Sequence, residues 1–220
     1  LRKLTAITSK TGTTIIFTEL TSDLIITGTG IITAVGSSGS EITFTKASGK
    51  NYRGHISFEN MKATNFSIFD YCIIEEADVH NNYDGNTITL PSARGGGLYI
   101  DFSKVRVSNS IIKNNYARNG GAICIEIDRD PIILNTIMEN NLAGETGGAI
   151  ILRRSSNALI KNCLIYENTA NNNSAGGGGI IFGKEAYNIK VINSVIASNN
   201  APNASEGDNV SFYQTTATEG

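Results

Sequence analysis

One short block recurs four times along the 220-residue chain. Each copy opens with two glycines and ends with an aliphatic residue: Gly95-Gly96-Gly97-Leu98, Gly120-Gly121-Ala122-Ile123, Gly147-Gly148-Ala149-Ile150 and Gly177-Gly178-Gly179-Ile180. The copies start at residues 95, 120, 147 and 177, so 25, 27 and 30 residues separate them. A repeat of this period indicates a solenoid, in which each repeat buries its apolar face only by stacking on its neighbours.

A second block follows each glycine block and carries two asparagines. The first asparagine precedes a small residue and two apolar residues, and the second comes three residues after the last apolar one. Stacked asparagine amides hydrogen-bond along the axis of a β-assembly, and asparagine also tolerates the left-handed backbone of a turn. We therefore expect two structural ladders, one made of Asn109, Asn135, Asn162 and Asn193 and the other of Asn115, Asn141, Asn168 and Asn199.

Alternation of apolar residues within the blocks predicts three short strands in each coil. The residues expected to face inward form four columns: Leu98, Ile123, Ile150 and Ile180; Ile100, Ile125, Leu152 and Phe182; Val107, Ile133, Ile160 and Val191; Ile112, Met138, Ile165 and Ile196. The chain lacks the 3.6-residue pattern of helical repeats, and its coils are too long for a hexapeptide left-handed helix. The predicted fold is all-β, a right-handed parallel β-helix of about eight to nine coils.

The solenoid is expected to occupy residues 1–220 as a single domain. Residues 1–60 read as threonine-rich N-terminal coils, 78–94 as an insertion loop, 95–200 as the regular repeats and 201–220 as a last coil and tail. Tyr71 stands where later coils have the first asparagine, which puts Cys72 in the same inner column as Cys163. With Cys124 the cysteines number three, so at least one is unpaired, and we expect buried free thiols.

The Gly-Gly-Ala-Ile and apolar-x-x-Asn signals resemble the repeats of chlamydial polymorphic outer membrane proteins. They are also similar to secreted or surface-bound bacterial proteins with pectate-lyase-like β-helices. The resemblance covers roughly residues 95–200, with isoleucine or methionine where the chlamydial motif prefers phenylalanine. It implies an extracellular or cell-surface protein of bacterial type that is adhesive or directed to polysaccharides.

Charge and hydropathy narrow the classes of partner. The chain has 18 Lys and Arg residues against 20 Asp and Glu, a net charge of −2, and no basic stripe that would indicate nucleic acid. No apolar run approaches the ~18 residues of a membrane-spanning helix, so this segment is not expected to cross a membrane.

The outward positions of the glycine-led strand form the candidate binding face. In each of the four coils the first outward position holds a small residue. The second outward position holds Tyr99, Cys124, Ile151 and Ile181 in turn, and the third holds Asp101, Glu126, Arg153 and Gly183. Such a face could bind a polysaccharide or surface glycan by stacking sugar C–H groups on an aromatic ring and hydrogen-bonding to charged groups. The expected ligand-binding residues are Tyr99, Asp101, Glu126, Arg153 and Arg154.

Two functional classes remain open from the sequence. The preferred one is a non-catalytic module that binds glycans or host surfaces, or associates with itself as a homo-oligomer or filament. The apolar outward row Ile111, Ile137, Leu164 and Val195 suggests contact with another segment or subunit.

The alternative is a polysaccharide lyase or glycoside hydrolase that uses Asp101, Glu126 and Arg153, because paired carboxylates serve glycoside cleavage. In a lyase, the two carboxylates could hold Ca²⁺ and Arg153 or Arg154 could act as the base. Apart from that calcium, no metal or other cofactor is expected. A flat or covered face at these residues would argue against the enzyme.

Overall fold

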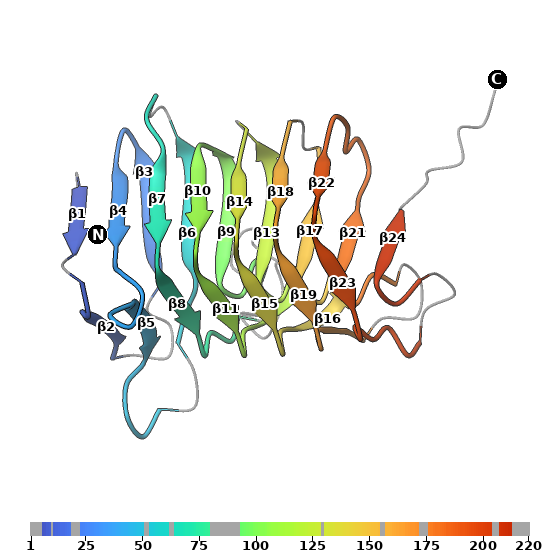
Figure 1. Cartoon of the computed structure of the whole chain (residues 1–220), viewed down its shortest axis with the longest axis horizontal. Coiled ribbons are helices and arrows are strands. Elements are labelled where there is room, and N and C mark those ends of the chain that lie inside the picture. The colour runs from blue at the N-terminus through green and yellow to red at the C-terminus, as the bar shows by residue number, and fades with distance from the viewer. Residues whose placement is uncertain are drawn as a thin grey trace, which may run out of the picture.

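The computed structural model describes residues 6–9, 11–18, 23–50, 53–61, 64–79, 93–128, 130–154, 157–171, 176–203 and 207–212. In these ranges the chain winds into an elongated solenoid, and three parallel sheets of seven strands each run along its length (Figure 1). A fourth sheet of three short strands lies in the regular repeats. The predicted all-β parallel solenoid is confirmed.

Each turn of the chain adds one strand to each long sheet. Sheet A contains β1 (Ala6–Ser9), β4 (Ile31–Val35), β7 (Ser67–Asp70), β10 (Val105–Ser108), β14 (Ile132–Leu134), β18 (Leu159–Lys161) and β22 (Lys190–Ile192). Sheet B contains β2 (Thr14–Phe17), β5 (Ile42–Lys46), β8 (Cys72–Glu75), β11 (Ile111–Lys113), β15 (Ile137–Glu139), β19 (Leu164–Tyr166) and β23 (Val195–Ala197).

The glycine-led strands form the third long sheet. Sheet C contains β3 (Leu24–Gly28), β6 (Ile56–Met61), β9 (Leu98–Ser103), β13 (Ile123–Asp128), β17 (Ile150–Leu152), β21 (Ile180–Phe182) and β24 (Val210–Phe212). The short sheet D, which was not expected from the repeat, contains β12 (Tyr116–Asn119), β16 (Leu142–Thr146) and β20 (Thr169–Ala170). Strands from the threonine-rich N-terminal region therefore belong to the same three long sheets as the regular repeats.

Like residues stack over like residues from one turn to the next. Ile123 pairs with Leu98 on one side and Ile150 on the other, and Ile150 pairs with Ile180. All four are fully buried in the main core cluster. The expected column is therefore a continuous apolar pillar, in which each side chain is covered by its counterparts in the neighbouring turns.

The number of turns is smaller than expected. Partners in adjacent turns are separated by 26, 27 and 31 residues in the regular repeats, but by 35 and 38 residues in earlier turns. Seven strands in a sheet are linked by six turns of the chain. The described strands thus make slightly fewer turns than the eight to nine coils expected, because that expectation extended the short spacing of the regular repeats over the whole chain. Most of the predicted insertion, residues 80–92, lies outside the described residues.

The second asparagines form the expected inner ladder. The Nδ2 group of each donates to the Oδ1 atom of the next, at 3.0 Å from Asn115 to Asn141, 2.9 Å from Asn141 to Asn168 and 2.9 Å from Asn168 to Asn199. The ladder continues for one step that was not predicted, from Asn199 to Asn209 at 3.0 Å. The same Oδ1 atoms accept backbone N–H groups, so the ladder satisfies turn groups that the core removes from water.

The first asparagines turn the corner between sheets A and B. All four have left-handed φ angles between 46° and 56°: Asn109, Asn135, Asn162 and Asn193. The side-chain amides of Asn109, Asn135 and Asn162 form a second, more exposed ladder, with bonds of 3.0 Å from Asn135 to Asn109 and 3.1 Å from Asn162 to Asn135. Asn193 shares the corner conformation of these three. Tyr71 occupies the same corner with a φ of 51°.

The residues after the corner also follow the prediction. Cys72 donates its backbone N–H to Ser110 Oγ at 3.0 Å, and Cys163 donates to Ser194 Oγ at 3.1 Å, which confirms that both cysteines occupy one inner column. All three cysteines are buried free thiols, as expected.

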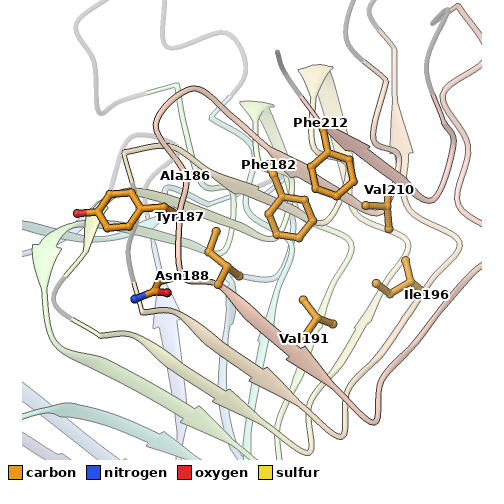
Figure 2. Close-up of a pocket in the computed structure, with 9 residues that line it drawn as sticks. Phe182, Ala186, Tyr187, Asn188, Val191, Ile196, Val210 and Phe212 are labelled. Carbon is orange, nitrogen blue, oxygen red and sulfur yellow. The ribbon is translucent and has the colours of Figure 1, made fainter. Parts of the chain in front are cut away.

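The last described turn leaves its inward residues partly uncovered. Val191, expected in the core, is 37% exposed, whereas Ile160 directly beneath it is fully buried. A pocket of about 440 Å³ lies at this end of the solenoid. Figure 2 shows four of the side chains that line it: Val191, Ile196, Phe182 and Phe212. The rings of Phe182 and Phe212 stack with their centroids 4.9 Å apart. Val191 occupies the inward position expected of it but is not buried, because the described structure places no further rung over it.

Candidate functional site

The outward row that was expected to form an open floor on sheet C is covered. Tyr99, Cys124, Ile151 and Ile181 pair in register across β9, β13, β17 and β21, but none is more than 4% exposed. They form a second apolar cluster, separate from the main core. The expectation of an accessible apolar strip is therefore wrong, and the Tyr99 ring is not positioned to stack on a sugar.

The turns between sheet D and sheet C lie against this covered row. A Cβ atom added to Gly120 would lie 2.9 Å from Cγ2 of Ile151, and one added to Gly177 would lie 2.9 Å from Cβ of Ile181. At the other end of the row, the buried ring of His55 stacks on Tyr99 with centroids 6.2 Å apart. Burial raises the pKa values of both the Tyr99 hydroxyl and the Cys124 thiol, the latter to about 12. Neither group is therefore a ready nucleophile.

Glu126 is held between two arginines. Arg94 Nη1 lies 2.6 Å from Glu126 Oε2, and Arg153 Nη1 lies 3.6 Å from the same oxygen. The Arg94 and Glu126 side chains are only 11% and 12% exposed. A carboxylate with two cationic partners at one oxygen is neutralised in place. This arrangement suits a structural ion pair better than a carboxylate that attacks a sugar carbon.

Asp101 and Glu126 are close but are not direct cross-strand neighbours. Register shifts between β9 and β13 place Asp101 opposite Ile127, so that Glu126 is the extra residue of a β-bulge. Asp101 is partly exposed. Desolvation, with smaller contributions from Glu126 and Glu59, raises the pKa of the Asp101 carboxyl. The two predicted carboxylates therefore lie near enough for the charge of Glu126 to affect Asp101, but they do not stack directly over each other as the repeat suggested.

An accessible edge remains at the carboxyl ends of the sheet C strands. We call it the sheet C edge, and its residues are Asp101, Phe102, Arg153 and Arg154. Phe102 is 45% exposed and has a left-handed φ of 51°. The side chains of Arg153 and Arg154 are 33% and 58% exposed, and Arg154 Nε lies 3.6 Å from Glu185. Of the five predicted ligand-binding residues, Asp101, Arg153 and Arg154 therefore remain accessible, whereas Tyr99 and Glu126 are buried.

Sequence reasoning missed Arg94, His55 and Phe102. Arg94 lies in the segment interpreted as an insertion, where no repeat indicates which way a side chain points. His55 Nδ1 lies 2.9 Å from the Arg94 carbonyl oxygen, which joins the two residues beneath the covered row. Phe102 follows the alternating part of β9, and its left-handed backbone breaks the period on which the prediction relied.

The described residues contain no group of three or more His, Cys, Asp or Glu side chains placed to hold a metal ion. The calcium that a lyase could require therefore has no candidate cage in those ranges. The same part of the chain contains no helix long and apolar enough to cross a membrane.

Neutralising Glu126 tests whether its role is structural. Glu126→Gln is expected to lower the free energy of unfolding by about 3 kcal/mol, because it leaves two arginines beside an uncharged amide in a mostly buried site. The matched control is Glu145→Gln. Glu145 pairs with Arg118 at 2.5 Å, but both side chains are about 30% exposed, and a loss of at most about 1 kcal/mol is expected. Urea unfolding measures both, and equal losses would contradict the structural role.

Comparison with known proteins gives the same architecture. A family model described as "Right handed beta helix region" matches residues 51–217, and this range contains the regular repeats and both asparagine ladders. No curated protein and no solved structure matched the chain. Because the match extends over most of the chain and the coils stack as parallel sheets, this protein belongs to the right-handed β-helix family.

Proposed function

We propose that this chain is a non-catalytic β-helix module that presents a long face to a glycan. The observation that carries the proposal is the difference between the surroundings of the two carboxylates, Glu126 and Asp101. Glu126 is bound by Arg94 and Arg153, whereas Asp101 lies on an accessible edge beside an exposed aromatic ring. The polar groups beside Glu126 are therefore arranged for recognition rather than for bond cleavage.

The sheet C edge matches the chemistry of an acidic polysaccharide. The exposed face of Phe102 offers an apolar surface for the C–H groups of a sugar ring. Arg153 and Arg154 offer planar guanidinium groups, which suit bidentate contact with a carboxylate or sulfate. Asp101 can accept a hydrogen bond from a sugar hydroxyl. A uronate-containing polymer lying along the solenoid would meet all three kinds of group.

A location outside the cytoplasm, secreted or at a cell surface, is part of this proposal. Its support is the resemblance of the glycine and asparagine blocks to those of bacterial surface and secreted proteins. A glycan ligand agrees with that location, because polysaccharides are displayed outside cells. Labelling intact cells that express the full-length protein with an impermeant reagent tests it, and a protein that is labelled only after lysis would overturn it.

Binding to immobilised polyuronates and to a glycan array tests the ligand. Phe102→Ala is expected to weaken binding by at least about tenfold, because it removes the stacking surface. Phe212→Ala is the matched control, since Phe212 is also exposed, at 61%, but lies at the C-terminal end of the structure. No binding by the unaltered protein, or equal losses in the two variants, would overturn the proposal.

The second candidate is a lyase or hydrolase acting on the same polymers. It is favoured by Asp101, whose pKa is raised by desolvation as in a general acid and which lies in the same edge as Arg153. Against it, Arg153 lies beside Glu126, and a protein guanidinium stays protonated and is a poor base. Incubation with uronate polymers, followed by the absorbance of unsaturated products and by reducing-end release, separates the candidates. Turnover that is lost in Asp101→Asn would establish the enzyme.

A further inference from the structure

An apolar stripe runs along the outside of sheet B. It consists of Ile73, Ile111, Ile137, Leu164 and Val195, which pair in register across five consecutive strands. Their neighbours Ile74, Ile112, Met138 and Ile165 point into the core, so the stripe faces outward. Leu164 is 36% exposed and Val195 is 57% exposed, and the other three are partly exposed. Sheet B forms the lower front row of strands in Figure 1.

Charged residues follow the stripe on one side and amides follow it on the other. The charged row is Glu75, Lys113 and Glu139, and the neutral Tyr166 continues it, again paired in register. Lys113 lies 3.5 Å from Glu75, and the Tyr166 hydroxyl donates to Glu139. On the other side of the stripe lie the exposed corner amides of Asn109, Asn135 and Asn162.

This face is complementary to itself about one twofold axis. If the axis runs along the strands midway between β11 and β15, a second copy presents its turns in reverse order. Ile111 then faces Ile137 of the partner copy, and Ile73 faces Leu164 of the partner copy. In the charged row, Lys113 faces Glu139 of the partner copy. An isologous interface requires this reciprocity, in which residue i meets j and j meets i.

The charges select this axis over its neighbours. An axis through β15 would bring Glu139 against its own counterpart, and an axis through β11 would bring Lys113 against its counterpart. Like charges facing each other across an interface are costly and exclude such arrangements. An axis midway between β8 and β11 would also pair opposite charges, Glu75 with Lys113, but it would set Ile137 opposite Thr43 of the partner copy. The axis between β11 and β15 pairs opposite charges and also keeps four stripe residues in contact with one another: Ile73, Ile111, Ile137 and Leu164.

We propose that the chain forms an antiparallel homodimer in which two copies pack sheet B face to face. The two sheets would lie about 10 Å apart, as stacked sheets do, and the five residues of the stripe cover about 19 Å along the axis at about 4.8 Å per strand. The sheet C edge is on another sheet. The dimer can therefore exist without any glycan, and the two proposals can fail separately.

Sedimentation equilibrium of the unaltered protein, without glycan and over a wide concentration range, tests the dimer. A reversible monomer–dimer equilibrium is expected, and Ile137→Glu should raise the dissociation constant by at least about 100-fold, because each dimer contains the substitution twice. Ile25→Glu is the matched control, since Ile25 is 44% exposed on sheet C, and it should leave the equilibrium unchanged. A protein that stays monomeric at every concentration overturns the proposal.

Charge reversal tests the position of the axis. Lys113→Glu alone should weaken the dimer by about tenfold or more, and the double variant Lys113→Glu with Glu139→Lys should restore it, because opposite charges again face each other. Circular dichroism of each variant checks that the solenoid is intact. A dimer that Ile137→Glu leaves unchanged, or a double variant weaker than either single one, overturns the assignment of this face.

Discussion

Replacing Asn168 with alanine is expected to lower the free energy of unfolding by about 4 kcal/mol. Asn168 is fully buried, and its Nδ2 group contacts three acceptors: the carbonyl oxygens of Met138 and Tyr166 and the Oδ1 atom of Asn199, each at 2.9 Å. Its Oδ1 atom accepts the backbone N–H of Asn141 at 3.0 Å and the Nδ2 of Asn141 at 2.9 Å. Alanine leaves these groups in an interior without water, and each unsatisfied group costs about 1–3 kcal/mol.

The outer ladder provides the matched control. Asn135→Ala removes the same amide, which also links two turns, but here the amides are exposed and water can replace the lost bonds. The remaining cost is that of alanine at a φ of 47°, about 1 kcal/mol. Thermal and urea unfolding of both variants measures the difference. If the two losses were equal, burial would not be what makes the inner ladder important.

The repeat made the fold predictable because a stacked coil imposes the same environment on equivalent residues. Leu98, Ile123, Ile150 and Ile180 recur because each must fill the same place against its neighbours. The second asparagines recur for the same reason, since each serves the turn of the adjacent coil. Turn lengths are not constrained in this way, since a longer loop between strands leaves the stacking intact. The number of turns was therefore overestimated.

The covered row on sheet C was misjudged, although its sequence contains the relevant signal. Ile123-Cys124-Ile125, Ile150-Ile151-Leu152 and Ile180-Ile181-Phe182 are continuous apolar runs without a polar alternate. Continuous runs are typical of strands buried on both faces, whereas alternation indicates one wet face. What covers the row comes from the turns after sheet D and from His55, which no local pattern connects with it.

The ion pair of Glu126 could not be predicted from the repeat. Arg94 is 32 residues away in the sequence and precedes the first regular coil. The β-bulge that displaces Glu126 from the position opposite Asp101 also leaves no trace in the spacing of the blocks. A side chain whose partner lies outside the repeated columns is positioned by a single tertiary contact that no repeat reveals. Contacts of this kind are the parts of the site that could not be predicted from the sequence.

Gly148→Ala is expected to have the largest effect of any substitution considered, a loss of more than about 4 kcal/mol. A Cβ atom at this position would lie 2.2 Å from the carbonyl oxygen of Gly178 in the next turn and 2.7 Å from the backbone C and N atoms of Thr169. All three are backbone atoms, so no side-chain rotation relieves the overlap. The turns would have to separate, which breaks the hydrogen bond from Gly148 N to Gly177 O and its neighbours.

The same geometry explains the order of residues in the repeated block. The first glycine has a left-handed φ, 68° at both Gly120 and Gly147, and the second approaches the next turn too closely for any side chain. The third position tolerates alanine, and Ala149 occupies it with full burial. In Gly-Gly-Ala, the first residue therefore provides the left-handed turn conformation, the second allows the close contact with the next turn, and the third is a small residue of the core.

Gly144→Ala is the control, because it makes the same change four residues earlier in the same turn. The nearest atom to a Cβ there is the Tyr116 hydroxyl oxygen at 3.7 Å, an ordinary contact, and the backbone is not left-handed. This variant should be neutral or more stable by up to about 1 kcal/mol, since alanine restricts the unfolded chain. Soluble yield, circular dichroism and thermal midpoints compare the two. If Gly148→Ala folded with the midpoint of Gly144→Ala, close stacking of the turns at this glycine could not be what the repeated block encodes.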